Sequence, residues 1–134
     1  MDKKQLVEAA LKAKKNAYAP YSHFPVGSAL LTKSGKVVTG CNVEVATYGG
    51  TICAERTALV KAVSEGHQDI KAICCVAETE NFCTPCGSCR QFIFEFGPDI
   101  EVIMANKRGE YRSASISELL PEAFGPATLT DKKE

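Results

Sequence analysis

The sequence lacks an excess of charge of either sign. Among its 134 residues, 16 lysines and arginines balance 16 aspartates and glutamates, and the formal net charge is zero. A protein that neutralises many phosphates of a polynucleotide usually carries a basic excess. The balance therefore predicts no nucleic-acid partner.

Long apolar segments are also missing. The N-terminus reads MDKKQLVEAALKAKK, which does not resemble a signal peptide. No apolar stretch approaches the ~20 residues that a membrane span needs. We therefore expect a cytoplasmic protein with no membrane partner. In a reducing compartment its seven cysteines are more often metal ligands, nucleophiles or core residues than disulfides.

The length and composition predict one hydrophobic core. Hydrophobic residues make up 45% of the sequence and charged residues 24%, which are ordinary values for a globular domain. We expect a single domain over residues 1–134, with a tail that frays from about residue 128.

Apolar periodicity and turn residues predict an α/β fold. The predicted helices cover residues 2–19, 53–65, 86–96 and 115–120, and the predicted strands cover residues 26–31, 37–41, 71–77, 100–105 and 110–112. This alternation favours helices on both faces of a sheet. The first two strands flank a Ser34-Gly35 turn and read as an antiparallel hairpin. The prediction is therefore a three-layer α/β/α fold with a mixed five-stranded sheet.

Three cysteines stand at the starts of predicted helices. Cys86 and Cys89 form C-G-S-C at one helix start, and Cys53 begins another. A helix start exposes N–H groups and a partial positive charge, which favour thiolates. Three protein ligands with a fourth position open to water are typical of a catalytic zinc. Glu55, two residues after Cys53, can reach that open position as an acid/base without binding the metal.

Spacing alone leaves other readings open. Cys83 precedes Cys86 by three residues and offers a fourth ligand, either for a structural zinc or, with Cys53, for an iron–sulfur cluster. C-G-S-C alone also matches a redox pair of the thioredoxin type.

We predict no chemical role for the remaining cysteines or for either histidine. Cys74 and Cys75 lie in a predicted buried strand and Cys41 ends another, so we expect core residues. His23 flanks a loop and His67 follows the glycine that ends a helix, so both are expected at the surface.

Glutamate two residues after Cys53, followed later by P-C-G-S-C, matches the signature of zinc-dependent base deaminases. Beyond this motif the chain resembles the small, homotetrameric cytidine deaminases over nearly its whole length. The matching segments are residues 18–22 (YAPYS), 24–31 (FPVGSALL), 40–44 (GCNVE), 53–58 (CAERTA), 85–91 (PCGSCRQ) and 119–121 (LLP), together with Phe124.

The resemblance implies hydrolytic deamination of free cytidine and deoxycytidine in pyrimidine salvage, with one Zn²⁺ per chain on Cys53, Cys86 and Cys89. It implies attack of zinc-bound hydroxide at C4, with Glu55 as the proton shuttle. Arg56 matches an arginine that contacts the ligand thiolates.

The resemblance also implies substrate contacts and a homotetramer. Asn42 and Glu44 match positions that bind the ribose hydroxyls, Phe24 matches an aromatic packed near the pyrimidine, and the backbone of Ala54 would help to hold the base. Phe124 matches a residue offered to a neighbouring subunit's site. One departure is Val45, which stands where many relatives carry asparagine.

Three classes of function compete at this point. The first is a hydrolase of free nucleosides, and the second is a metal-binding or redox module without turnover. The third is a deaminase of polynucleotides, which the balanced charge and short chain disfavour.

Overall fold

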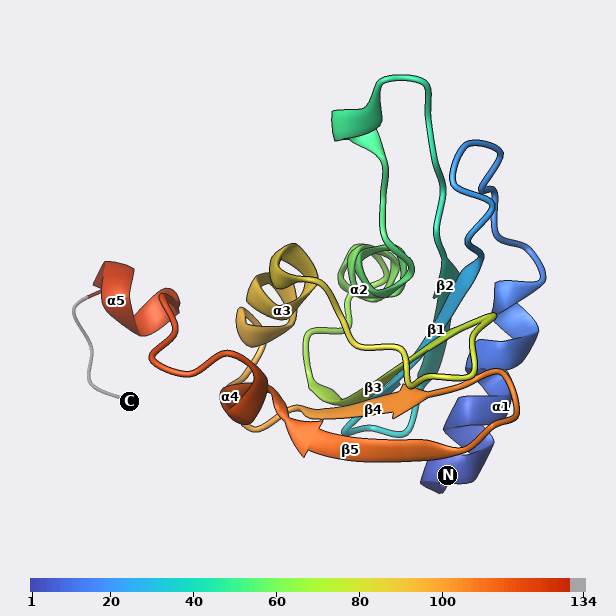
Figure 1. Cartoon of the computed structure of the whole chain (residues 1–134). Helices are drawn as coiled ribbons and strands as arrows, with labels where there is room; N and C mark the ends of the chain where they lie inside the picture. The colour runs from blue at the N-terminus through green and yellow to red at the C-terminus, as the bar shows by residue number, and fades with distance from the viewer. Residues whose placement is uncertain (131–134) are drawn as a thin grey trace.

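The computed structural model describes residues 1–130 as an α/β fold (Figure 1). Its helices are α1 (Lys3–Lys14), the single 3-10 turn η1 (Tyr48–Gly50), α2 (Ala54–Ser64), α3 (Gly87–Phe94), α4 (Ile116–Leu119) and α5 (Pro126–Thr130). Its strands are β1 (Val26–Thr32), β2 (Val37–Cys41), β3 (Ile70–Ala77), β4 (Glu101–Ala105) and β5 (Tyr111–Ser115). Within residues 1–130 no helix has both the length and the apolar character to cross a membrane.

The five strands form one mixed sheet in the order β2-β1-β3-β4-β5. The β1–β2 hairpin is antiparallel, as the turn at Ser34-Gly35 predicted, and β1 also pairs antiparallel with β3. β3 and β4 are parallel, and β5 returns antiparallel to β4. The parallel pair requires a crossover, which α3 supplies. The predicted mixed five-stranded sheet is confirmed.

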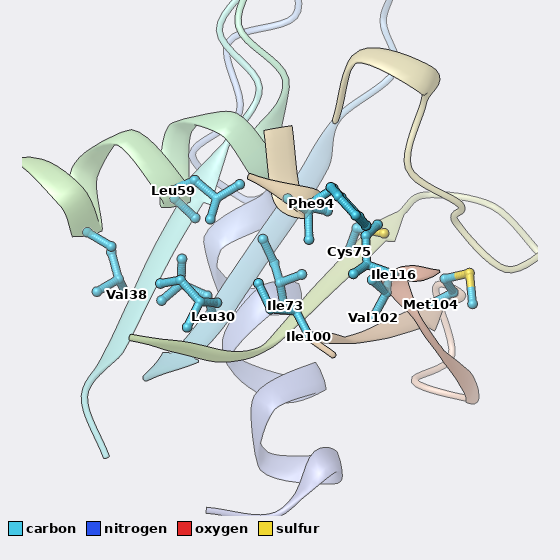
Figure 2. Packing of buried hydrophobic residues seen from close by; sticks show 14 residues of the cluster. Leu30, Val38, Leu59, Ile73, Cys75, Phe94, Ile100, Val102, Met104 and Ile116 are labelled. Carbon is cyan, nitrogen blue, oxygen red and sulfur yellow. The ribbon is translucent and has the colours of Figure 1, made fainter. Parts of the chain in front are cut away.

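Helices cover both faces of the sheet (Figure 1). On one face Leu6, Val7 and Ala10 of α1 are buried against β1 and β3. On the other face α2 and α3 pack over a second apolar cluster, part of which Figure 2 shows between helix and strand. Leu59 of α2 and Phe94 of α3 belong to this cluster. The predicted three-layer arrangement is therefore confirmed.

The first helix is shorter than predicted. Apolar spacing and Pro20 predicted a helix over residues 2–19, but α1 ends at Lys14. The Tyr18 N–H donates to the carbonyl of Asn42 at 2.9 Å, and Tyr18 forms an isolated bridge with Val43. This pairing with a distant segment draws the chain out of the helix, so a tertiary hydrogen bond sets the boundary.

The C-terminal segment holds a helix that the sequence did not predict. Residues 128–130 of the tail expected to fray form the end of α5, and residues 131–134 lie outside the described residues. The other predicted boundaries agree to within a few residues, and the predicted strand 110–112 extends as β5 to Ser115.

Helix α2 packs directly on the bare backbone of β2. A Cβ atom added to Gly40 would lie 2.5 Å from the Ala58 nitrogen and 2.8 Å from the Ala54 carbonyl oxygen. No real Cβ atom approaches backbone that closely, so glycine at this position allows α2 to rest on the sheet. The position of α2 in turn sets where its first residues lie.

We predict that Gly40→Ala lowers the free energy of unfolding by roughly 1–3 kcal/mol, because the added methyl group forces α2 away from the sheet. Denaturant unfolding at fixed protein and zinc concentrations measures the loss. Gly49→Ala is the control, since a Cβ at Gly49 meets no atom within 4 Å. Equal stability of the two variants would contradict the close-packing argument.

Candidate metal centre and active site

The candidate site lies beyond one end of the strands, where β1 begins and where β2 and β3 end. Val26 at the start of β1 pairs with Ala77 at the end of β3, and Gly27 pairs with Cys41 at the end of β2. The segments that flank β1 and β2 and the helix that follows β3 therefore converge. Ligands of open α/β sheets commonly bind beyond the carboxyl ends of the strands.

Three cysteine sulfurs meet at this end of the sheet. Cys53 and Cys86 occupy the N-cap positions of α2 and α3, and Cys89 lies in the first turn of α3. Their Sγ atoms all lie within 4.8 Å of one another, and the Cys86 and Cys89 sulfurs are 3.4 Å apart. The two helix starts thus bring together the three cysteines that the sequence singled out.

Arg56 contacts this cluster. Its Nη2 donates to Cys53 Sγ at 3.3 Å and to the Thr51 carbonyl at 3.4 Å. A hydrogen bond from Cys89 and the nearby guanidinium of Arg56 lower the pKa of the Cys53 thiol to about 5. The Cys89 thiol, as the donor in that pair, has a raised pKa. Cys53 is therefore a ready thiolate.

Glu55 lies beside the sulfurs in the first turn of α2, and only 5% of its surface is exposed. Burial raises the pKa of its carboxyl to about 7, and the nearby Cys53 sulfur contributes in the same direction. A carboxyl group with a pKa near neutrality can both accept and return a proton. Its environment suits the acid/base role that the sequence suggested.

A pocket of about 400 Å³ opens over Glu55. Of the predicted substrate-binding residues, Phe24, Asn42, Glu44 and Ala54 all line it. Phe24 is 47% exposed, so its ring offers an apolar surface to a ligand. The lining also includes residues that the sequence analysis did not select for substrate binding, namely Ser22, Val26, Thr51, Cys83 and Thr84. Ser22 had a detectable signal, because it ends the matched stretch 18–22, just before the stretch that begins with Phe24.

Asn42 holds the backbone on both sides of Pro25. Its Nδ2 donates to the Phe24 carbonyl at 2.9 Å, and its Oδ1 accepts from the Val26 N–H at 2.9 Å. The side chain is 8% exposed. Asn42 therefore has a structural task in addition to any contact with a ligand.

Glu44 binds the loop that precedes Phe24. Its Oε1 accepts from the Tyr21 N–H at 3.1 Å and the Ser22 N–H at 3.0 Å, and its Oε2 accepts from the Ser22 hydroxyl. The Ser22 hydroxyl and these N–H groups hold the pKa of Glu44 below its usual value. The carboxylate is thus ionised and already partly satisfied.

Cys83 is not part of the sulfur cluster found among residues 1–130. It lines the pocket, its carbonyl accepts from the Cys75 thiol at 3.1 Å, and its N–H donates to the Ala105 carbonyl at 2.9 Å. Cys74 and Cys75 are buried in the core, as predicted. Cys41, also expected in the core, is partly exposed because β2 is an edge strand of the sheet.

Phe124 does not line the pocket of its own chain. Its carbonyl accepts from Gln91 Nε2 at 2.7 Å, and the residue is 56% exposed. Val45, 40% exposed, donates its N–H to the Thr51 hydroxyl at 3.3 Å. His23 is exposed and His67 partly so, as predicted.

The donor set fits zinc. Thiolates are soft ligands that select zinc among the common divalent ions, and helix N-termini offset their negative charge. Three ligands leave a coordination position for water, which is the pattern of catalytic rather than structural zinc sites. The buried Glu55 beside the cluster agrees with a catalytic site.

Comparison with known families gives one model that matches residues 1–105, described as the cytidine and deoxycytidylate deaminase zinc-binding region. A cytidine deaminase from Halalkalibacterium halodurans is 48% identical over 132 residues, which are 98% of this chain and 100% of the relative. A cytidine deaminase from Sporosarcina psychrophila is 45% identical over 97% of this chain and 96% of its own length.

Solved structures agree. The crystal structure of cytidine deaminase from Burkholderia pseudomallei has a TM-score of 0.89 and 50% identity, and covers 92% of this chain and 100% of that one. Cytidine deaminase from Mycobacterium tuberculosis has a TM-score of 0.82 and 38% identity, over 93% of this chain and 98% of that one.

We predict one zinc ion per chain, bound by three sulfurs and one lighter atom, because within residues 1–130 three thiols and no fourth meet in the cluster. X-ray absorption at the zinc edge measures the ligand set, and four sulfurs would contradict it. Cys86→Ala should lose zinc. Cys83→Ala is the matched control, and we expect it to retain the metal.

Proposed function

The chain belongs to the cytidine and deoxycytidylate deaminase family, and we propose that it hydrolyses free cytidine and deoxycytidine to uridine and deoxyuridine with release of ammonia. The observation that carries the proposal is the buried carboxyl of Glu55 beside three clustered cysteine sulfurs, where Glu55, Cys53 and Cys86 line a pocket. The pocket volume of about 400 Å³ suits a small molecule.

Cys53, Cys86 and Cys89 would hold the zinc. When bound, zinc acts as a Lewis acid that lowers the pKa of a water molecule in the site. Three thiolates and one Zn²⁺ carry a net charge of −1, which disfavours the loss of a proton from that water. Arg56 lies 3.3 Å from Cys53 Sγ and reduces this excess of negative charge.

Glu55 moves the protons of the reaction. It accepts a proton from the attacking water and delivers it to N3 of the pyrimidine, while a bond forms between the water oxygen and C4. It then takes the remaining proton of the new C4 hydroxyl group and passes it to the amino group; the C4–O bond becomes a carbonyl as the C4–N bond breaks, and ammonia leaves. Burial favours this role, because the neutral and ionised forms of Glu55 become close in energy.

The pocket walls bind the nucleoside. Phe24 packs against the pyrimidine ring, and the backbone of Ala54 at the start of α2 holds the base. Asn42 and Glu44 bind the sugar hydroxyls. Glu44 accepts three hydrogen bonds from its own chain, and a carboxylate offers about four acceptor positions, which leaves room for one sugar hydroxyl.

The chain acts as a single domain in the cytoplasm, in pyrimidine salvage, and as a homotetramer whose sites are shared between subunits. The exposed ring of Phe124, outside its own pocket, supports its contribution to a neighbouring site.

Ultraviolet absorbance with cytidine and with deoxycytidine tests the proposed activity. A loss of absorbance that depends on protein and nucleoside, with one ammonia released per nucleoside consumed, is the expected result. A zinc-loaded protein that changes neither nucleoside would overturn the proposal and favour a metal-binding module without turnover.

We predict that Glu55→Gln keeps the fold and the zinc but reduces kcat by at least a hundred- to ten-thousandfold, because an amide cannot carry protons. Steady-state kinetics and metal analysis on the same sample measure both properties. Glu65→Gln, at the exposed C-terminal end of α2, is the matched control and should be as active as the wild type. A zinc-loaded Glu55→Gln variant with normal turnover would assign the proton transfers to another group.

We predict that Glu44→Gln weakens turnover of cytidine by about ten- to a hundredfold in kcat/KM, the value of one hydrogen bond to a charged acceptor. Zinc content should not change. A dideoxy analogue that lacks the 2′ and 3′ hydroxyls should lose much less, since its sugar has nothing to donate to Glu44. Equal losses for both substrates would show that Glu44 acts only through the loop it binds.

We predict that light scattering gives the mass of four chains and that Phe124→Ala raises KM for cytidine while the tetramer persists. The reason is that the ring lines the neighbour's pocket rather than its own. An active monomer would refute the shared site.

A further inference from the structure

The ring of Phe24 lines the pocket. The residue is 47% exposed, so packing within the chain covers only part of it. Its backbone is instead held on both sides by polar side chains. The Phe24 N–H donates to Ser22 Oγ at 3.1 Å, and the Phe24 carbonyl accepts from Asn42 Nδ2 at 2.9 Å.

Ser22 links this backbone to Glu44. Its hydroxyl donates to Glu44 Oε2 and accepts from the Phe24 N–H, so one oxygen joins the carboxylate to the aromatic residue. The hydroxyl uses its single proton on the carboxylate and one of its two lone pairs on the N–H. An alanine or a methyl group in this position provides neither bond.

The backbone conformation of His23, which lies between Ser22 and Phe24, also indicates that the loop before Phe24 is held in place. His23 has φ of 56°, a left-handed conformation that costs a residue with a side chain some free energy. The His23 N–H donates to the Ala19 carbonyl at 3.1 Å, which closes the turn. The hydrogen bonds to Glu44 and Ser22 on either side stabilise this turn, and the turn directs Phe24 toward the pocket.

We propose that Ser22 is a positioning residue for nucleoside binding, acting through Phe24: its hydroxyl connects the Glu44 carboxylate to the Phe24 backbone and so holds the aromatic ring over the base. The inference rests on the proposed function, in which Phe24 packs against the pyrimidine and Glu44 binds the sugar. Through Ser22, the residue that contacts the base (Phe24) and the residue that contacts the sugar (Glu44) belong to one hydrogen-bonded unit.

The inference predicts a specific kinetic pattern. Ser22→Ala should raise KM for cytidine by roughly tenfold, near the lower end for a hydrogen bond to a charged group, because Ser22 is exposed to solvent. Its kcat should change little, since the proton transfers at Glu55 are not touched. Ser22→Thr should restore KM, because threonine keeps the hydroxyl. Ser34→Ala, in the hairpin turn far from the pocket, is the matched control.

A double-mutant cycle tests the route through Phe24. In a Phe24→Ala background, Ser22→Ala should change KM by less than about twofold, because the ring that it positions is gone. Zinc content should equal that of the wild type in every variant. A tenfold effect in both backgrounds, or an unchanged KM in Ser22→Ala alone, would overturn the inference while the deaminase activity of the wild type stands. A wild type that leaves cytidine unchanged would overturn the proposed function and this inference with it.

Discussion

The crowding of three sulfur atoms at two helix starts is the constraint on which the site depends. Thiolates within 4.8 Å of one another repel strongly in a partly buried setting, so they can share this volume only where positive charge is concentrated. Two helix N-termini and Arg56 provide that charge, and a divalent ion completes it. Helices α2 and α3 must therefore both begin at the same end of the strands. The parallel β3–β4 crossover and the bare backbone at Gly40 bring this about.

Local sequence patterns were sufficient to predict most of the fold and the metal ligands. The order of helices and strands and the Gly turn of the hairpin were predicted from spacing, because those signals act between neighbouring residues. The end of α1 was not, since it depends on the Tyr18–Asn42 hydrogen bond between segments far apart in the chain. Helix α5 was missed because its short sequence has no apolar face that a pattern could detect.

The residues of the substrate pocket were harder to predict from the sequence than the metal-binding cysteines. Cys53, Glu55, Cys86 and Cys89 form compact motifs whose chemistry is visible in the residue types. Ser22 and Glu44 are 22 residues apart, and a serine in a loop has no pattern that indicates a carboxylate partner. The resemblance named Asn42 and Glu44 but gave no sign that their side chains also hold the chain around Phe24. Only the folded structure reveals this second task.

The separation between helices and loops at this site has an evolutionary consequence. The sulfurs and Glu55 stand on α2 and α3, which are packed on the core, so a substitution there changes stability and chemistry together. Phe24, Ser22 and Val45 stand on connecting segments that the core does not constrain. Selection can therefore alter which nucleoside enters while the reaction stays the same.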